Sequence, residues 1–358
     1  MKTKFLGVIA IVGLLAVSSS AQDIHFSQFY ESPLTMNPAL CGMFRGDDYI
    51  GLNYKNQWGS VMGSGYGFNT IAAEAEMHNL VKKWTTAYLS PGLSFYNDKS
   101  GDAKMGVTEV CFTLGSGVQL DDHNTFAVGL QGGWAQRSIT TSSLEWGTQY
   151  NPNVAGGYDP NMSPDPLTGN SFSYGDFSGG LSWNYAQGST NMTSNNYFRI
   201  NAGAAAYHIN EPNQSYYGES SSPGGKLYIR WVGHVLVDYS LPNTNVGLIP
   251  SAVYYLQGPA QETDLGLKVR YVLRQNSKYT GFVKGSALDL GAYYRVGDSF
   301  IPMVQIEFGS YALGVSYDAN VSSLSRVAAG AGGFEISLRF LNPNPFMTGG
   351  GSSSQSMF

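Results

Sequence analysis

The chain has 358 residues, a net charge of −5 and only 13% charged residues, beside 45 glycines and 24 tyrosines. Average chains carry about 25% charged residues and about 7% Gly, so this is not the composition of an ordinary soluble protein. The charge excludes a basic nucleic-acid-binding surface. No run of about twenty apolar residues predicts a transmembrane helix. Gly and Tyr enrichment with few charges favours many strands, with aromatic residues suited to membrane interfaces.

The first residues have the features of a secretory signal peptide. Two lysines precede an apolar run over 5–17 that is too short to span a bilayer. Small residues at 19–21 then provide a cleavage position. We expect 1–21 to be removed by a cut after Ala21; a retained membrane anchor is the alternative.

The region 22–47 does not have the pattern of a spanning strand. Prolines interrupt it, and its aromatic side chains need burial. We expect a plug or rim segment that packs in a barrel lumen or against the periplasmic rim. Its candidate plug or partner contacts are His25, Phe26, Phe29, Tyr30, Asn37 and Pro38.

From residue 48 onward, apolar and polar residues alternate with a period of two. In the segment 333–340, four apolar residues alternate with Glu335, Ser337 and Arg339. Segments of about ten residues with this period, divided by turns, are typical of an outer-membrane barrel. They begin near residues 48, 66, 85, 105, 123, 172, 196, 225, 246, 260, 284, 300, 311 and 332. Those near 105–118 and 196–210 alternate poorly and are rich in Gly and Ala.

The sequence therefore predicts an all-β protein, a transmembrane antiparallel β-barrel of about 14 strands over 48–341. Closure is required because a sheet edge in lipid would leave backbone groups unpaired. The polar positions of the strands then face the lumen, where solvating it is their simplest role. They include Lys268, Arg270, Asp289, Glu307, Glu335 and Arg339.

The lengths of the connections predict the orientation, because periplasmic turns are short and outer loops are longer. With the first strand running outward, the tight turns at 121–122, 242–245 and 309–310 are periplasmic, and the long stretches at 139–171, 211–224 and 319–331 are outside. Longer inner connections near 77–84 and 275–283 are exceptions.

Beyond the last strand, 342–358 has the Gly/Ser composition of a flexible tail, with Phe346 and Phe358 as candidate partner contacts. Cys41 and Cys111 permit either one disulfide or two free thiols.

The sequence contains no catalytic motif, so we expect no enzyme. Five scattered histidines leave a membrane phospholipase as a minor alternative: His25, His78, His123, His208 and His234. No cofactor is expected. The loop 151–170 has oxygen ligands for calcium at Asn153, Asp159, Asn161 and Asp165, but it lacks the spacing of a calcium loop and a plain surface loop is favoured.

Three stretches of the sequence together resemble one known family. They are HFSQFY at 25–30 with PLTMNPAL at 33–40, GLNYKNQW at 51–58, and SYDAN at 316–320 leading to GFEISL at 333–338. In this order they resemble the PorP/SprF family of the Bacteroidota type IX secretion and gliding machinery. The tail past Phe340 is less typical of that family.

The resemblance implies a non-enzymatic outer-membrane barrel of a Gram-negative bacterium. SprF-like members support export and surface anchoring of a large adhesin with a type B C-terminal domain. Other members are linked to a periplasmic peptidoglycan-binding partner, which makes a secretion assembly component one alternative. A small-solute porin is a second alternative. The resemblance also implies architectural roles: Asn37 and Pro38 shape a turn, and Asn53, Gln57 and Glu335 are polar positions near the lumen or rim.

Overall fold

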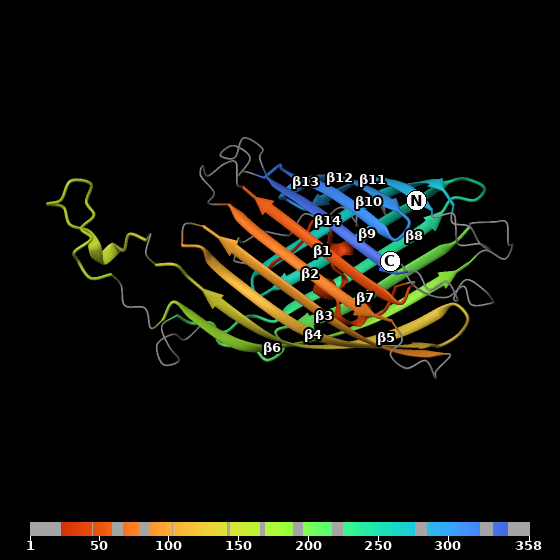
Figure 1. Cartoon of the computed structure of the whole chain (residues 1–358), viewed down its shortest axis with the longest axis horizontal. Coiled ribbons are helices and arrows are strands. Elements are labelled where there is room, and N and C mark those ends of the chain that lie inside the picture. Colours follow the sequence, from red (N-terminus) through yellow and green to blue (C-terminus); the bar gives the residue numbers. More distant parts are fainter. Residues whose placement is uncertain are drawn as a thin grey trace, which may run out of the picture.

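The strands, along which apolar and polar residues alternate, close into one antiparallel barrel in which β1 pairs with both β2 and β14 (Figure 1). The computed structural model describes residues 23–44, 46–58, 67–78, 86–101, 103–141, 144–164, 169–188, 196–216, 225–275, 285–322 and 332–342. The expected signal peptide, most of the expected tail, Phe346 and Phe358 lie outside these residues.

Fourteen strands lie within the described ranges. They are β1 (Asp48–Gln57), β2 (Phe68–Met77), β3 (Ala87–Ser100), β4 (Met105–Gln119), β5 (Asn124–Ser138), β6 (Ser171–Gln187), β7 (Phe198–Tyr207), β8 (Arg230–Ser240), β9 (Val246–Gln257), β10 (Ala260–Arg274), β11 (Ser286–Arg295), β12 (Ser299–Phe308), β13 (Tyr311–Asn320) and β14 (Gly333–Asn342). The predicted barrel of about 14 strands is confirmed. The largest error in a strand start is at β8, expected near 225 and beginning at Arg230.

Short helical turns precede the barrel and interrupt one loop. They are η1 (Phe29–Glu31), α2 (Pro33–Met36), η2 (Pro38–Leu40) and η3 (Gly147–Gln149). Pro33 and Pro38 stand at first helical positions, where the missing N–H is not needed. In the described chain, the helices are all too short or too polar to cross a bilayer.

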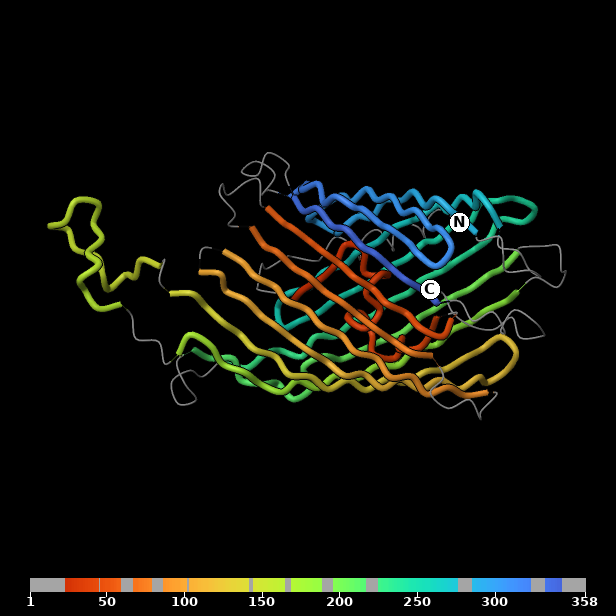
Figure 2. The backbone as a smooth tube through the Cα atoms, in the orientation of Figure 1, coloured from red at the N-terminus to blue at the C-terminus, as the bar shows by residue number. Residues whose placement is uncertain are grey.

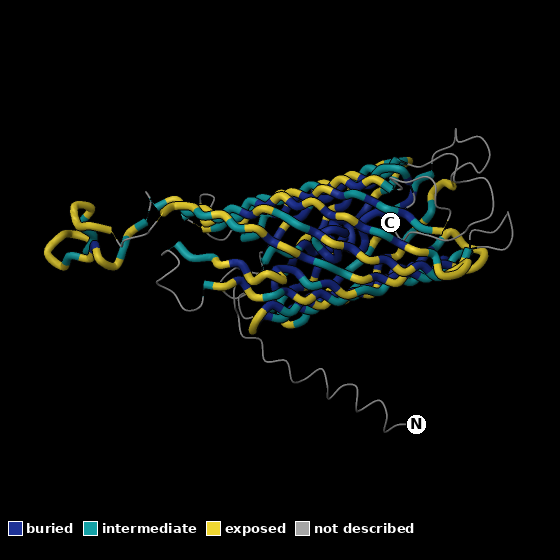
Figure 3. Tube along the Cα trace, turned by 90° about the horizontal axis from the view of Figure 1, so that it is seen from below, coloured by how far each residue is buried: buried dark blue, intermediate teal, exposed yellow. Residues whose placement is uncertain are grey.

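The two faces of each strand differ in burial as the period of two requires. On β14, Phe334 and Leu338 are about two-fifths exposed on the outside, whereas Glu335 and Ser337 are buried inside. Figure 3 shows buried and exposed residues alternating along the strands in view. The outer face is therefore apolar and the inner face polar.

Aromatic side chains gather on the outer face at both ends of the barrel, as in the interface belts of membrane barrels. One belt contains Phe95, Trp134, Phe177, Trp231, Tyr254 and Phe300. The other contains Phe126, Trp183, Tyr239, Tyr271, Phe308 and Tyr311.

The connections follow the predicted lengths only in part. The long connections after β5, β7 and β13 lie at one end of the barrel, which we call the outer end. At the opposite end, which we call the inner end, tight turns join β4 to β5, β8 to β9 and β12 to β13. Two connections at the outer end are also tight, β9 to β10 and β11 to β12. Loop length alone therefore leaves the orientation a prediction.

Candidate functional site

Residues 23–44, which we call the plug, lie inside the barrel (Figure 2). The predicted packing of this segment in the lumen is confirmed. The candidate residues Phe26, Phe29 and Tyr30 are at most 3% exposed, and Asn37 is fully buried. The plug is therefore part of the protein's interior.

The plug runs from the outer end of the lumen to the inner end. Asp23 contacts His208 and Gln257, at the outer ends of β7 and β9. Near the other end of the plug, the N–H of Gly42 donates to Glu76 on β2 at 2.8 Å, and its carbonyl contacts His78. The plug thus follows most of the height of the barrel.

The seam between β1 and β14 is tied to the plug from both sides. The Glu335 carboxylate of β14 accepts hydrogen bonds of 2.8 Å from the N–H groups of Ser27 and Gln28. On β1, Tyr49 and Asn53 donate to the carbonyl of Glu31, each at 3.1 Å. The two bonds to the Glu335 carboxylate involve a charged acceptor, and such hydrogen bonds are among the stronger ones in proteins.

A second set of contacts, a network of charged side chains, links the plug to strands β10–β14. Arg339 bridges Glu31 of the plug at 3.2 Å and Glu307 at 2.7 Å. Arg270 pairs with Glu307 at 2.7 Å and Asp289 at 3.1 Å. All six polar residues assigned to the lumen from sequence lie on the inner face, and these pairings give most of them a structural role rather than that of solvating open water.

Lys268, the one lumen residue of the six not yet described, contacts an aromatic ring. Its Nζ lies 3.5 Å from the ring centroid of Tyr30, a cation–π distance, and Tyr30 stacks on Tyr293 of the wall at 5.8 Å. Phe29 meets Tyr293 edge-on at 5.5 Å. These rings form an aromatic contact between the plug and the wall.

On the opposite wall, glycines make room for the turn at Asn37 and Pro38. Asn37 donates to the Leu181 carbonyl at 3.0 Å. A Cβ at Gly180 would overlap the Asn37 side-chain oxygen, and one at Gly129 would overlap the Pro38 carbonyl. The backbone of the plug approaches this wall too closely for any side chain there.

The outer end of the plug is held by a buried ion cluster. His208 lies between Asp23 at 2.5 Å and Asp176 at 2.9 Å. Burial opposes the charge of His208, but the two carboxylates outweigh it and raise its pKa from the ordinary 6.5 to about 9. Burial likewise opposes ionisation of Asp23, yet His208 and Arg230 hold its pKa well below the usual value.

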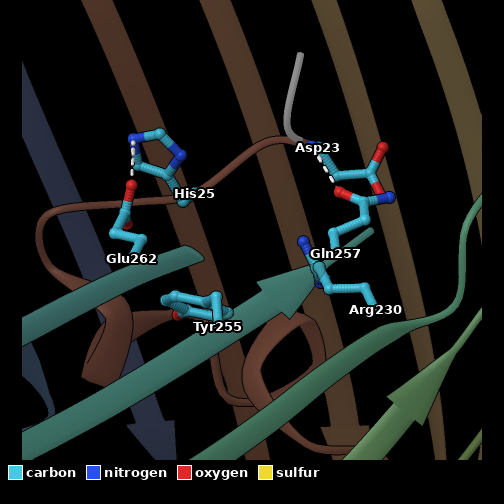
Figure 4. Close-up of a pocket in the computed structure, with 6 residues that line it drawn as sticks. All are labelled: Asp23, His25, Arg230, Tyr255, Gln257 and Glu262. Atoms are coloured by element: carbon cyan, nitrogen blue, oxygen red, sulfur yellow. Dashed lines mark hydrogen bonds and ion pairs between the residues drawn. The ribbon is translucent and has the colours of Figure 1, made fainter. Parts of the chain in front are cut away.

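A small cavity lies beside this cluster, lined by Asp23, His25, Arg230, Tyr255, Gln257 and Glu262 (Figure 4). His25 points to Glu262 at 3.6 Å, while burial lowers its pKa well below the ordinary value. The cavity measures about 10 Å³, and a second one beside Lys268 about 30 Å³. Since a water molecule needs roughly 10–15 Å³, the first cavity has room for one water at most and the second for about two.

Several plug contacts were missed from the sequence. They come from Lys55, His208, Arg230, Arg295 and Asp318, and Asp176 is joined to the plug through His208. Lys55 and Asp318 lie within the family-like stretches, and alternation places both on the inner face. That signal could have found them, whereas His208 lies just past β7 and carries no such mark.

Other predicted chemistry can be placed as well. Asp159 of the loop after β5 bonds to Asn151 and Asn161, and Asp165 lies outside the described residues. Within the described ranges, no three His, Cys, Asp or Glu residues gather where they could hold a metal ion. Cys41 and Cys111 are both buried free thiols.

One buried row of Ser182, Asn201 and His234 lacks the geometry of an activated nucleophile, because Asn201 separates its ends. The Asn201 amide donates to Ser182 at 3.0 Å, and its oxygen contacts Nε2 of His234 at 2.8 Å. A general base must reach the hydroxyl that it activates. This row supports packing of β6, β7 and β8.

The chain is similar in outline to solved barrels of low sequence identity. A TodX monoaromatic hydrocarbon channel mutant is 9% identical, with 92% of this chain and 97% of that chain covered and a TM-score of 0.45. BamA from Haemophilus ducreyi is 10% identical, with 83% and 71% covered and a TM-score of 0.37. At such values the likeness says nothing of function. Among curated proteins, none matches the chain.

The sequence model of one family, described as the type IX secretion system membrane protein PorP/SprF, matches residues 18–340. A membrane protein of a secretion system that crosses the bilayer as a closed barrel lies in the outer membrane of a Gram-negative cell. The match extends over the plug and almost all of the barrel, including the contacts that join them. This chain belongs to the PorP/SprF family of type IX secretion system membrane proteins.

Proposed function

We propose that this protein is a non-enzymatic docking barrel that supports export and surface anchoring of a large type IX-secreted adhesin with a type B C-terminal domain. The observation that carries the proposal is the filled lumen of a barrel in a secretion-system family. A barrel whose lumen is filled by its own chain offers its walls and loops for binding rather than an open pore for transport.

The contacts of the plug support this assignment. Buried side chains of the wall meet it along its length, and Arg230 alone donates to the carbonyls of Ile24 and Thr35, each at 3.0 Å. Removing one partner of a buried polar pair costs about 1–3 kcal/mol, so release of the whole plug would be costly. The adhesin is therefore expected to bind at an end of the barrel and not to pass through it.

The proposal is tested by deleting the gene in its host and following the adhesin. Loss of the adhesin from the cell surface, restored by the wild-type gene, is the expected result, together with co-purification of the two proteins from native membranes. An adhesin that stays attached after the deletion contradicts the proposal. Co-purification of periplasmic secretion components alone would favour the assembly role.

The polar inner face with both charge signs favours the porin as a second candidate. Planar-bilayer recordings separate the two. The docking barrel predicts little conductance from the intact protein and a large increase after removal of residues 23–44. Large, stable open pores in the intact protein would favour the porin.

A further inference from the structure

Strands β3 to β6 have 14 to 17 residues, whereas β2 and β7 beside them have 10 each (Figure 1). β6 has 17 residues, whereas its partner β7 has 10. Pairing with β7 begins at Gly179 and runs to Gln187, while pairing with β5 extends from Ser171 to Tyr185. The outer part of β6 is therefore an edge of the sheet.

The direction of the backbone groups along this edge can be read from the hydrogen bonds. The Phe177 carbonyl accepts a hydrogen bond from the Ile209 N–H, so the backbone N–H and C=O groups of odd-numbered residues in β6 point away from β5. The Asn170 carbonyl accepts a hydrogen bond from the Ile139 N–H, so the backbone groups of even-numbered residues point toward β5. In an antiparallel strand both backbone groups of a residue point the same way.

Asn210 marks where the covered part of the edge ends. Its side chain accepts from the Phe177 N–H at 3.2 Å and donates to the Gly175 carbonyl at 2.7 Å. Beyond it, Ser171, Ser173 and Gly175 are exposed. In the described part of the chain, the Ser173 N–H and C=O have no hydrogen-bond partner.

An aromatic strip flanks this edge on the side that faces the lumen. Phe172 packs edge-on against Tyr216 at 4.8 Å and lies 6.2 Å from Tyr174, each centroid to centroid. All three rings are partly exposed. A strand added to this edge would place alternate side chains on these rings.

We propose that the edge Ser171–Gly175 is a docking edge at which an extended segment of the secreted polypeptide adds as a further strand to β6. Only a polypeptide in extended form presents donors and acceptors at the spacing of a strand edge, and backbone pairing with side-chain pockets is a general mode of peptide recognition. The inference rests on the proposed docking function and names the place where the cargo binds.

The first test is photo-crosslinking in living cells with benzoylphenylalanine at Ser173. The matched control is Ser138, an exposed residue of β5 that pairs with Ser171 on one side and Gly106 on the other. A crosslink to the adhesin from position 173 and none from position 138 is the expected result. A crosslink to a second copy of the barrel or to another segment of the same chain would overturn the inference.

The second test removes the N–H donor of the edge with Ser173→Pro. Proline is tolerated on edge strands, and the lost N–H points away from β5. Surface-retained adhesin should fall about tenfold, as expected for a lost hydrogen bond. Ser173→Ala keeps the N–H and should retain the adhesin, so the difference between the two variants isolates the backbone donor.

Barrel folding is checked for each variant by heat-dependent mobility in gels, and only folded variants are compared. If Ser173→Pro retains as much adhesin as Ser173→Ala while gene deletion releases it, the docking edge is wrong and the docking function stands. If gene deletion itself releases no adhesin, the proposed function fails and the docking edge with it.

Discussion

The carboxylate of Glu335 accepts a hydrogen bond of 2.8 Å from the backbone N–H of Ser27, and so connects the last strand of the barrel to the plug. The same carboxylate accepts from Gln28, while β1 holds the carbonyl of Glu31. Both strands of the seam therefore depend on the plug for buried hydrogen bonds.

Replacing Glu335 with Gln should destabilise the barrel by about 1–3 kcal/mol, because one of two backbone N–H groups would face an amide NH₂ instead of an oxygen. The measurement is the temperature at which purified protein loses its heat-dependent gel mobility. Glu145→Gln, in an exposed loop, is the control. Equal transition temperatures for the two variants would contradict the role given to Glu335.

Gly180→Ala should displace the plug, since the new Cβ would overlap the Asn37 side chain. The buried thiol of Cys41 should then react faster with a maleimide, and the conductance of the barrel should rise. In the control Gly233→Ala, the new Cβ meets no atom within 4 Å. Unchanged labelling and conductance in Gly180→Ala would show that the wall tolerates a side chain there.

The ion cluster at His208 predicts a pH dependence of stability. The folded pKa of about 9 lies above the ordinary 6.5, so the stabilisation is full below pH 6.5 and is lost as the pH rises to about 9. Facing His208 are the carboxylates of Asp23 and Asp176, and Arg230 lies near Asp23.

Thermal stability of the wild type and of His208→Gln, measured from pH 6 to pH 10, checks this prediction. The advantage of the wild type should shrink between pH 6.5 and pH 9. A constant difference across that range would mean that His208 does not carry a proton between the two carboxylates.

The orientation predicts different access to two engineered cysteines. Asn153→Cys, in the long loop after β5, should react with a membrane-impermeant maleimide on intact cells. Asp122→Cys, in the tight turn between β4 and β5, should react only after the outer membrane is opened. Both positions are exposed and the native thiols are buried, so background labelling is low. The reverse labelling pattern would show that the barrel has the opposite orientation in the membrane.

The strands could be predicted from sequence because lipid and lumen impose opposite chemistry on neighbouring residues. The two segments that alternated poorly show where this signal weakens. Gly115 of β4 lies against Cys41 of the plug, and Gly203 of β7 lies against Asn37. Small residues are used there because the plug lies directly against the wall, and the pattern of apolar and polar residues is lost.

The contacts of the plug could be predicted only as a class. Aromatic residues at 26, 29 and 30 indicate burial, but the partner of each depends on residues that lie hundreds of positions away, as for Ser27 and Glu335. The Asp23–His208–Asp176 cluster depends on three such segments meeting at one level of the lumen. Local sequence carries no sign of that meeting.

The path of the plug also joins parts of the chain that lie far apart in the sequence. Residues 27–31 bond to β1 and β14 at once, and Asn37 bonds to the far wall. In the closed barrel, β14 and β1 meet around a segment to which both are bonded. The closing seam and the plug therefore share one set of buried contacts, so a change that loosens either is felt by both.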